Sequence, residues 1–461
     1  MRRMIRWSML AVSLTALVAA ALPAGADHKT YPSTSNIHAL GHSVQIGTFS
    51  APDGQRVISS DLAFWGKLAY QGNYNGFRVI DISAPGNPKL LSHPTCNGDQ
   101  GDIVVWEDIL VRAWNTKRAV PRECSGETVA AGFEGVHVFD VSDPTNPTVV
   151  DVDGPHLGLE LPCGSHTVTA AGIDDGDLIV YSNISSSSGC TGGDPAGDFM
   201  DVIAVPLDDP AGAALIHREP LAGPTTPVAT GCHDVGVILG DVNKAVCASA
   251  DTTNVFDIAN PRDPALLFTI TEPGVGQAGT NGRWHSGAFT WDGEVIVLGW
   301  EPGGGGDAEC QATDPDVDKS MFFYDADTGA KLGQWVLPRA QGPDENCTIH
   351  NYNMVPLRSG RHVAVGGHYQ AGTWVVDFTD PANPITVAWA DPPSLGPGPF
   401  CPATTPPGCH LGGAWSSYWY NGEVYETDIT RGLAVYKVSD SAVAGALKLD
   451  HLNPQTQEFS L

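Results

Sequence analysis

Histidine recurs at one position of a repeated pattern, and this recurrence is the strongest sign of chemistry in the sequence. It stands just before a β-rich stretch, in the contexts Ser-His-Thr, Cys-His-Asp, Trp-His-Ser, Ile-His-Asn and Cys-His-Leu. Imidazoles gathered in one place bind borderline metals such as Cu or Zn when neutral, and anions when protonated. The candidate metal-binding ring comprises His166, His233, His285, His350 and His410, with Ser60 and Gly101 at the same position in two further repeats.

Acidic and polar residues stand close to this position and form a supporting group. In the repeats they either follow it directly or lie near the end of the next expected strand. Such residues could complete a metal coordination shell or act as general acids and bases. A structural interpretation stays open, because polar residues at strand starts and turns often bond to the backbone. The supporting candidates are Asp61, Asp102, Asp234, Asn115, Asn183, Glu301, His368 and Glu426.

A third pattern has the spacing of part of a calcium loop. Asp314, Asp316 and Asp318 alternate with other residues, but the central glycine and final glutamate of an EF-hand are missing. We therefore expect a solvated acidic loop, with calcium as the weaker alternative. The chain has no nucleophile elbow, P-loop or HExxH motif, so the sequence leaves open whether the protein is an enzyme.

A seven-fold repeat supplies the elements that must position these residues. Its clearest copies read Gly135-Val-His-Val-Phe-Asp-Val-Ser-Asp-Pro-Thr-Asn-Pro147 and Gly372-Thr-Trp-Val-Val-Asp-Phe-Thr-Asp-Pro-Ala-Asn-Pro384. Each copy predicts two strands joined by a proline turn, with two more strands upstream, which is the unit of a propeller blade. We therefore predict an all-β fold, a seven-bladed β-propeller of four-stranded antiparallel blades. The key position falls at Asp81, Asp140, Val205, Asp257, Asp325, Asp377 and Lys437.

The two ends of the repeat array indicate how the ring closes. The last copy lacks an obvious fourth strand, and the segment His42–Phe49 reads as a strand with no repeat before it. We expect this segment to supply the missing outer strand, since closure removes open sheet edges. The residues beyond Ser441 are the alternative. The innermost strands would then line a channel, with the histidines around one mouth.

The repeat motif resembles that of the LVIVD repeat family of bacterial and archaeal surface or secreted proteins. The resemblance is clearest at 76–91, 135–150, 253–268 and 372–387 and is weaker in the other three copies. It implies a β-propeller outside the cytoplasm, and it implies no particular activity.

The N-terminus reads as a secretory signal. Three arginines precede an apolar stretch that ends in Ala24-Gly25-Ala26, a small-residue cleavage site. We predict a signal peptide at 1–26, cleaved near Ala26, the propeller at 27–440 and a tail at 441–461. Removing the three arginines changes the net charge from −28 to −31, and such a surface repels nucleic acid.

Ten cysteines in an exported chain favour disulfides. Most stand just before an innermost strand or in a long insertion between the second and third strands. Pairing between near neighbours would hold these insertions over the histidine face. The predicted bonds are Cys96–Cys124, Cys163–Cys190, Cys232–Cys247, Cys310–Cys347 and Cys401–Cys409.

The sequence thus predicts a secreted or cell-surface binding scaffold that acts through a loop-rich, histidine-bearing face. Its expected partner is an extracellular protein, a glycan or a small ligand, and we expect a monomer without a transmembrane segment. The alternative is a copper- or zinc-dependent extracytoplasmic enzyme with its metal at the channel mouth.

Overall fold

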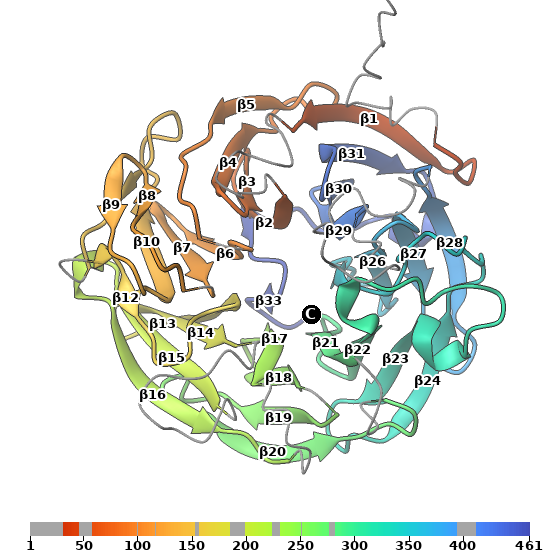
Figure 1. Ribbon diagram of the computed structural model, residues 1–461. Helices are drawn as coiled ribbons and strands as arrows, with labels where there is room; N and C mark the ends of the chain where they lie inside the picture. Colours follow the sequence, from red (N-terminus) through yellow and green to blue (C-terminus); the bar gives the residue numbers. More distant parts are fainter. Residues whose placement is uncertain are drawn as a thin grey trace, which may run out of the picture.

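Small antiparallel sheets stand around a central axis and form a propeller-like ring (Figure 1). The computed structural model describes residues 31–45, 58–98, 100–115, 117–152, 156–184, 199–223, 231–249, 251–275, 282–393 and 412–461. Strands dominate this part of the chain, and its helices are short 3-10 turns. The predicted all-β propeller is confirmed, whereas the count of seven blades stays a prediction.

Within a sheet the strands follow in chain order, with the first strand at the centre of the ring (Figure 1). One sheet contains β17 (Cys232–Ile238), β18 (Lys244–Ser249), β19 (Thr253–Asp257) and β20 (Ala265–Ile270). Every residue of β17 is buried, while most of β20 is exposed. This innermost strand is therefore packed on both faces, and a residue placed at its start is removed from solvent.

The other sheets repeat this arrangement. One holds β2 (Ser59–Trp65), β3 (Leu68–Asn73), β4 (Gly76–Asp81) and β5 (Lys89–Ser92). The next holds β6 (Ile103–Trp106), β7 (Ile109–Trp114), β10 (Gly135–Asp140), β11 (Thr148–Val149) and β12 (Leu159–Glu160). The insertion hairpin is β8 (Arg122–Cys124) and β9 (Glu127–Val129). A third holds β13 (Thr167–Asp174), β14 (Asp177–Asn183), β15 (Phe199–Pro206) and β16 (Ala214–Pro220).

The remaining strands complete the ring. One sheet holds β21 (Gly282–Phe289), β22 (Val295–Pro302), β23 (Ser320–Asp325) and β24 (Lys331–Val336). An eight-stranded sheet holds β25 (Asn351–Met354), β26 (Val363–Gly367), β27 (Thr373–Asp377), β28 (Ile385–Ala390), β29 (Ala414–Tyr420), β30 (Glu423–Asp428), β31 (Gly432–Val438) and β1 (Ile37–Val44). The 3-10 turns are η3 (Pro210–Gly212), η4 (Gly303–Gly305), η5 (Asp316–Lys319) and η6 (Ser441–Val443).

The aspartate of the repeat motif closes the turn after the third strand. The Asp81, Asp140 and Asp257 carboxylates each accept the backbone N–H two residues further on, at 2.8–2.9 Å. This Asx turn stabilises the change of direction before the outer strand. The most regular feature of the sequence is therefore a folding device.

The N-terminal strand closes the ring as the outer strand of the last repeat. β1 pairs antiparallel with β31, from Ile37 opposite Val438 to Val44 opposite Gly432. The predicted source of this strand is confirmed, although it begins five residues earlier than His42. Apolar side chains fill the spaces between neighbouring sheets, as where Val246 of β18 and Leu298 of β22 share one cluster.

The C-terminal segment crosses the centre of the ring, where β33 and the chain end lie (Figure 1). β32 (His451–Leu452) pairs with the end of β2, and β33 (Thr456–Gln457) runs parallel to the end of β17. Asn453 exchanges two hydrogen bonds with the backbone of Val105. The tail therefore occupies the channel end opposite the strand starts.

Several predictions fall on residues outside the described part of the chain. They concern the signal peptide at 1–26, His410, Cys190, Cys401 and Cys409. Among the described residues, no helix is long and apolar enough to span a membrane.

Candidate functional site

β-bulges position histidines at the starts of two innermost strands. In β17, Cys232 pairs with Ser249 and Asp234 with Ala248, so His233 is the extra residue. In β21 the same shift leaves His285 unpaired between Trp284 and Ser286. A bulge bends the strand and redirects its side chains. The side chains of His233 and His285 consequently meet at the channel mouth.

Four imidazoles from successive sheets lie in contact and form what we call the histidine arc: His166, His233, His285 and His350. Ring centroids are 4.6 Å apart for the first neighbouring pair, 3.9 Å for the second and 4.0 Å for the third. All four are at most 5% exposed. The four described members of the predicted ring therefore form an arc on one side of the channel mouth, while His410 lies outside the described residues.

Other residues occupy the matching positions on the remaining sheets. The bulge of β29 falls at Trp415, between Ala414 and Ser416, and the Trp415 ring lies 4.5 Å from that of His350. By strand register Trp415, rather than His410, is the counterpart of His233. Gly101 has φ +69°, and a Cβ there would lie 2.6 Å from the Asn73 carbonyl oxygen, so this position excludes a histidine.

Glu301, near the end of β22, extends its carboxylate into the arc. Oε2 lies 4.0 Å from His285 Nε2, and Oε1 lies 4.0 Å from His350 Nε2. The Tyr369 hydroxyl donates to Oε1 at 2.7 Å. A Cβ on Gly305 would lie 2.6 Å from this same oxygen, so the glycine allows the loop to approach the carboxylate. His233, His285 and Glu301 form a group whose ligand atoms all lie within 4.8 Å of one another.

The imidazoles at both ends of the arc are oriented by specific partners. The backbone carbonyl of Trp415 accepts a hydrogen bond from Nδ1 of His350, which leaves the lone pair on Nε2, the nitrogen that faces Glu301. The Asn115 amide nitrogen lies 2.7 Å from Nδ1 of His166, whose Nε2 lies 3.1 Å from Nε2 of His233. In the described structure, Nδ1 of His233 and Nδ1 of His285 have no hydrogen-bond partner.

Burial determines the charge state of the arc. It lowers the pKa of His166 and of His350 to about 3, and it lowers those of His233 and His285 well below the usual range. Burial also raises the pKa of Glu301, against the opposing effects of the Arg283 charge and the Tyr369 hydrogen bond. The imidazoles are therefore neutral near pH 7, the form that coordinates metals.

The three aspartates that follow the repeat position lie at the channel and are buried. Burial raises the pKa of Asp61, Asp102 and Asp234, and the charges of Asp61 and Asp234 add to the effect on Asp102. Asp61 accepts hydrogen bonds from Tyr418, Asn351 and Gln455. This carboxyl group thus connects the strand starts to the C-terminal segment.

Two supporting candidates lie in separate packing environments. His368 packs against Trp335 and Trp374, and Glu426 accepts a hydrogen bond from Thr373. Burial raises the pKa of Glu426 to about 7.

The remaining candidates have local structural partners. The Asn183 side chain donates to the Thr167 hydroxyl. Asp314 accepts the backbone N–H of Gln311, and Asp316 lies 3.7 Å from Lys319 Nζ. Among the described residues, the groups close enough to hold an ion do not include the three aspartates of the calcium-like pattern.

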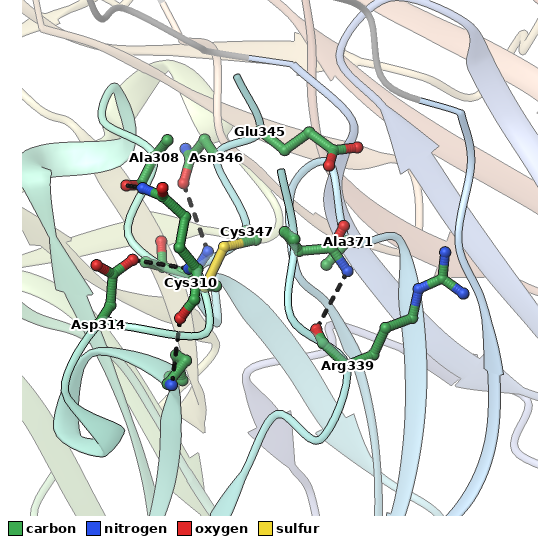
Figure 2. The surroundings of a disulfide bond; sticks show 12 residues. Ala308, Cys310, Asp314, Arg339, Glu345, Asn346, Cys347 and Ala371 are labelled. Carbon is green, nitrogen blue, oxygen red and sulfur yellow. Dashed lines mark hydrogen bonds between the residues drawn. A yellow bond between two sulfur atoms is a disulfide. The ribbon is translucent and has the colours of Figure 1, made fainter. Parts of the chain in front are cut away.

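Disulfides brace the segments beside the arc, and three of the predicted pairs are confirmed: Cys96–Cys124, Cys232–Cys247 and Cys310–Cys347. Cys163 is also disulfide-bonded, and its predicted partner lies outside the described residues. Figure 2 shows how Cys310–Cys347 ties the loop after β22 to the segment before β25. The disulfides fit a protein of an oxidising, extracellular environment.

Sequence reasoning missed Trp415, Tyr369 and the tail amides of Asn453 and Gln455. Trp415 could have been found by aligning the strand rather than the nearest histidine. Tyr369 carries no repeat signal, since its contact with Glu301 joins the loop after β26 to the end of β22.

A family model now identifies the repeat. The model of the LVIVD repeat matches residues 58–94, which span β2 to β5. This chain carries an LVIVD repeat. The predicted resemblance is confirmed there, and the matched segment includes Asp61 and the Asx turn of Asp81. The matched segment forms one sheet of the ring, and the histidines of the arc lie outside it. No curated protein matches the chain.

Proposed function

We propose that the protein is an exported binding scaffold, a seven-bladed propeller that takes its ligand at the histidine end of the channel. The count of seven treats the eight-stranded sheet as two blades, because β25 and β29 meet only through a two-residue parallel contact. Five further sheets supply the other blades.

The contrast between the two channel ends carries this proposal. Residues 451–461 occupy one end, whereas disulfide-braced segments surround the arc at the other. Loops that carry function on a rigid scaffold are the usual arrangement in binding proteins. The disulfides also support export.

A blocking experiment tests which end binds. A single cysteine is introduced by Thr313→Cys, in the loop at the histidine end, or by Asp241→Cys, in the turn after β17 at the opposite end. Both positions are exposed. Each variant is coupled to a maleimide polyethylene glycol and applied to arrays of extracellular glycans and secreted proteins. We expect the label at position 313 alone to abolish binding. Equal binding by both labelled variants would contradict the proposal.

Export is tested separately on the full chain. N-terminal sequencing of the protein recovered from the medium should begin near Asp27. Protein retained in the cytoplasm with residues 1–26 attached would contradict export.

A further inference from the structure

We propose that the histidine arc binds one divalent transition metal ion, Zn or Cu, through His233, His285 and Glu301, with His350 beside Glu301 as a further ligand. This inference rests on the proposed function, because it names the ligand of the same channel end. It is argued from the spacing, the orientation and the burial of the donor atoms.

The spacing selects an ion rather than a larger ligand. Neighbouring rings of the arc are 3.9–4.6 Å apart, and no organic molecule fits between side chains at that separation. Donor atoms around tetrahedral zinc lie about 3.3 Å apart, from bond lengths of about 2.0–2.1 Å. The 4.0 Å separations from Glu301 to His285 and to His350 need only a small contraction.

The donor chemistry selects the class of metal. Imidazole nitrogens with one carboxylate suit Zn and Cu, whereas Ca and Mg prefer oxygen ligands throughout. The Glu301 carboxylate presents one oxygen to each of two histidines. One ion between them would draw both rings toward the same centre.

The surrounding hydrogen bonds fit ligands that are held in place. A ligating histidine usually donates its other ring N–H to a carbonyl, which fixes its tautomer. His350 has this arrangement, with Nδ1 at the Trp415 carbonyl and Nε2 toward Glu301. His285 is 3% exposed, and its Nε2 lies 4.0 Å from Glu301 Oε2. Burial thus keeps the two donor atoms apart from solvent at the distance from which an ion could join them.

The test is metal binding to the untagged mature chain. The protein is stripped with a chelator and titrated with Zn²⁺, Cu²⁺ or Co²⁺. We expect one tightly bound equivalent, and Co²⁺ should give the visible absorption of a site with nitrogen and oxygen ligands. Glu301→Gln keeps the side-chain shape and should weaken binding roughly 100-fold. At the same Zn²⁺ concentration, the melting temperature of the wild type should rise by more than that of this variant.

His362→Asn is the matched control. It removes the histidine from the partly exposed group Asp292, Glu294 and His362, and it should leave the tight equivalent intact. An unchanged metal affinity of Glu301→Gln would overturn the proposal. Loss of the tightly bound equivalent in His362→Asn would overturn it as well. If the protein binds no metal while the label at position 313 still blocks an array ligand, the metal site fails and the scaffold function stands.

Discussion

The two ends of the central channel are filled in different ways. At one end, side chains from successive sheets meet directly, as where Nε2 of His166 lies 3.1 Å from Nε2 of His233. At the other, a separate segment crosses the opening and bonds to inner strands through its backbone and side chains, as where the Thr456 hydroxyl donates to the Ala170 carbonyl. A segment bonded to several inner strands stabilises a closed end, whereas neutral imidazoles beside a carboxylate fit a ligand site.

The largest effect should follow removal of the crossing segment. Deleting residues 451–461 eliminates the β32 and β33 contacts and the bonds of Asn453, Gln455, Thr456 and Gln457. At about 1 kcal/mol for each net hydrogen bond, less the ordering entropy of the segment, we expect a loss on the order of 5 kcal/mol. Denaturant unfolding of the mature chain measures this loss. Deleting Leu461 alone is the control and should cost about 1 kcal/mol.

A second effect concerns the loop that covers the arc. Cys310 and Cys347 are 37 residues apart, while Cys232 and Cys247 are 15 apart. Loop-closure entropy predicts a loss of about 4 kcal/mol for Cys310→Ser with Cys347→Ser, against about 3 kcal/mol for the shorter loop. Both double variants are compared by denaturant unfolding. Both disulfides lie beside the arc, so a larger loss for the shorter loop would show that loop length does not decide how much each contributes.

Low pH should lower the free energy of unfolding through the buried histidines of the arc. In the metal-free protein, burial lowers the pKa of His166 to about 3, so the folded state binds fewer protons than the unfolded state between pH 6.5 and 3. The stability from the neutral ring is present above pH 6.5 and is lost as the pH falls through this window. At pH 5 the loss is about 2 kcal/mol for one histidine.

A comparison of variants isolates this effect from nearby carboxyl groups. The raised pKa values of Glu301, Asp102 and Asp234 act in the opposite direction, but they are shared by wild type and variant. The wild type should therefore lose about 2 kcal/mol more than His166→Asn between pH 7.5 and pH 5. Parallel pH profiles would contradict a neutral His166 ring.

The smallest effect should follow removal of the side chain that orients His166. Asn115→Ala removes the partner of Nδ1 of His166 and should cost about 1 kcal/mol. Thermal unfolding measures this cost, with Asn87→Ala at an exposed turn position as the control. A loss equal to the control would show that His166 keeps its position without Asn115.

The fold could be predicted from the sequence because interactions between residues close in the chain determine each repeat. The turn aspartate, the prolines and the alternating strands recur, so a single pattern predicts most of the ring. The site could be read only in part. The repeat position identified four histidines of the arc, but strand register replaced His410 by Trp415 at the last position. The contacts of Glu301 with Tyr369 and of Asp61 with Gln455 join distant segments, and no local pattern encodes them.

The closing strand has a consequence for how the chain reaches its native state. Ile37 and Val438 are paired neighbours, yet nearly the whole mature chain is synthesised between them. Contacts between residues so far apart in the sequence form slowly, because the entropy cost of closing a long loop comes before the contacts stabilise the structure. Until β31 emerges, β1 is an unpaired strand open to wrong pairing. A secretion route that releases the chain unfolded would make this last pairing the step at which aggregation competes with completion of the ring.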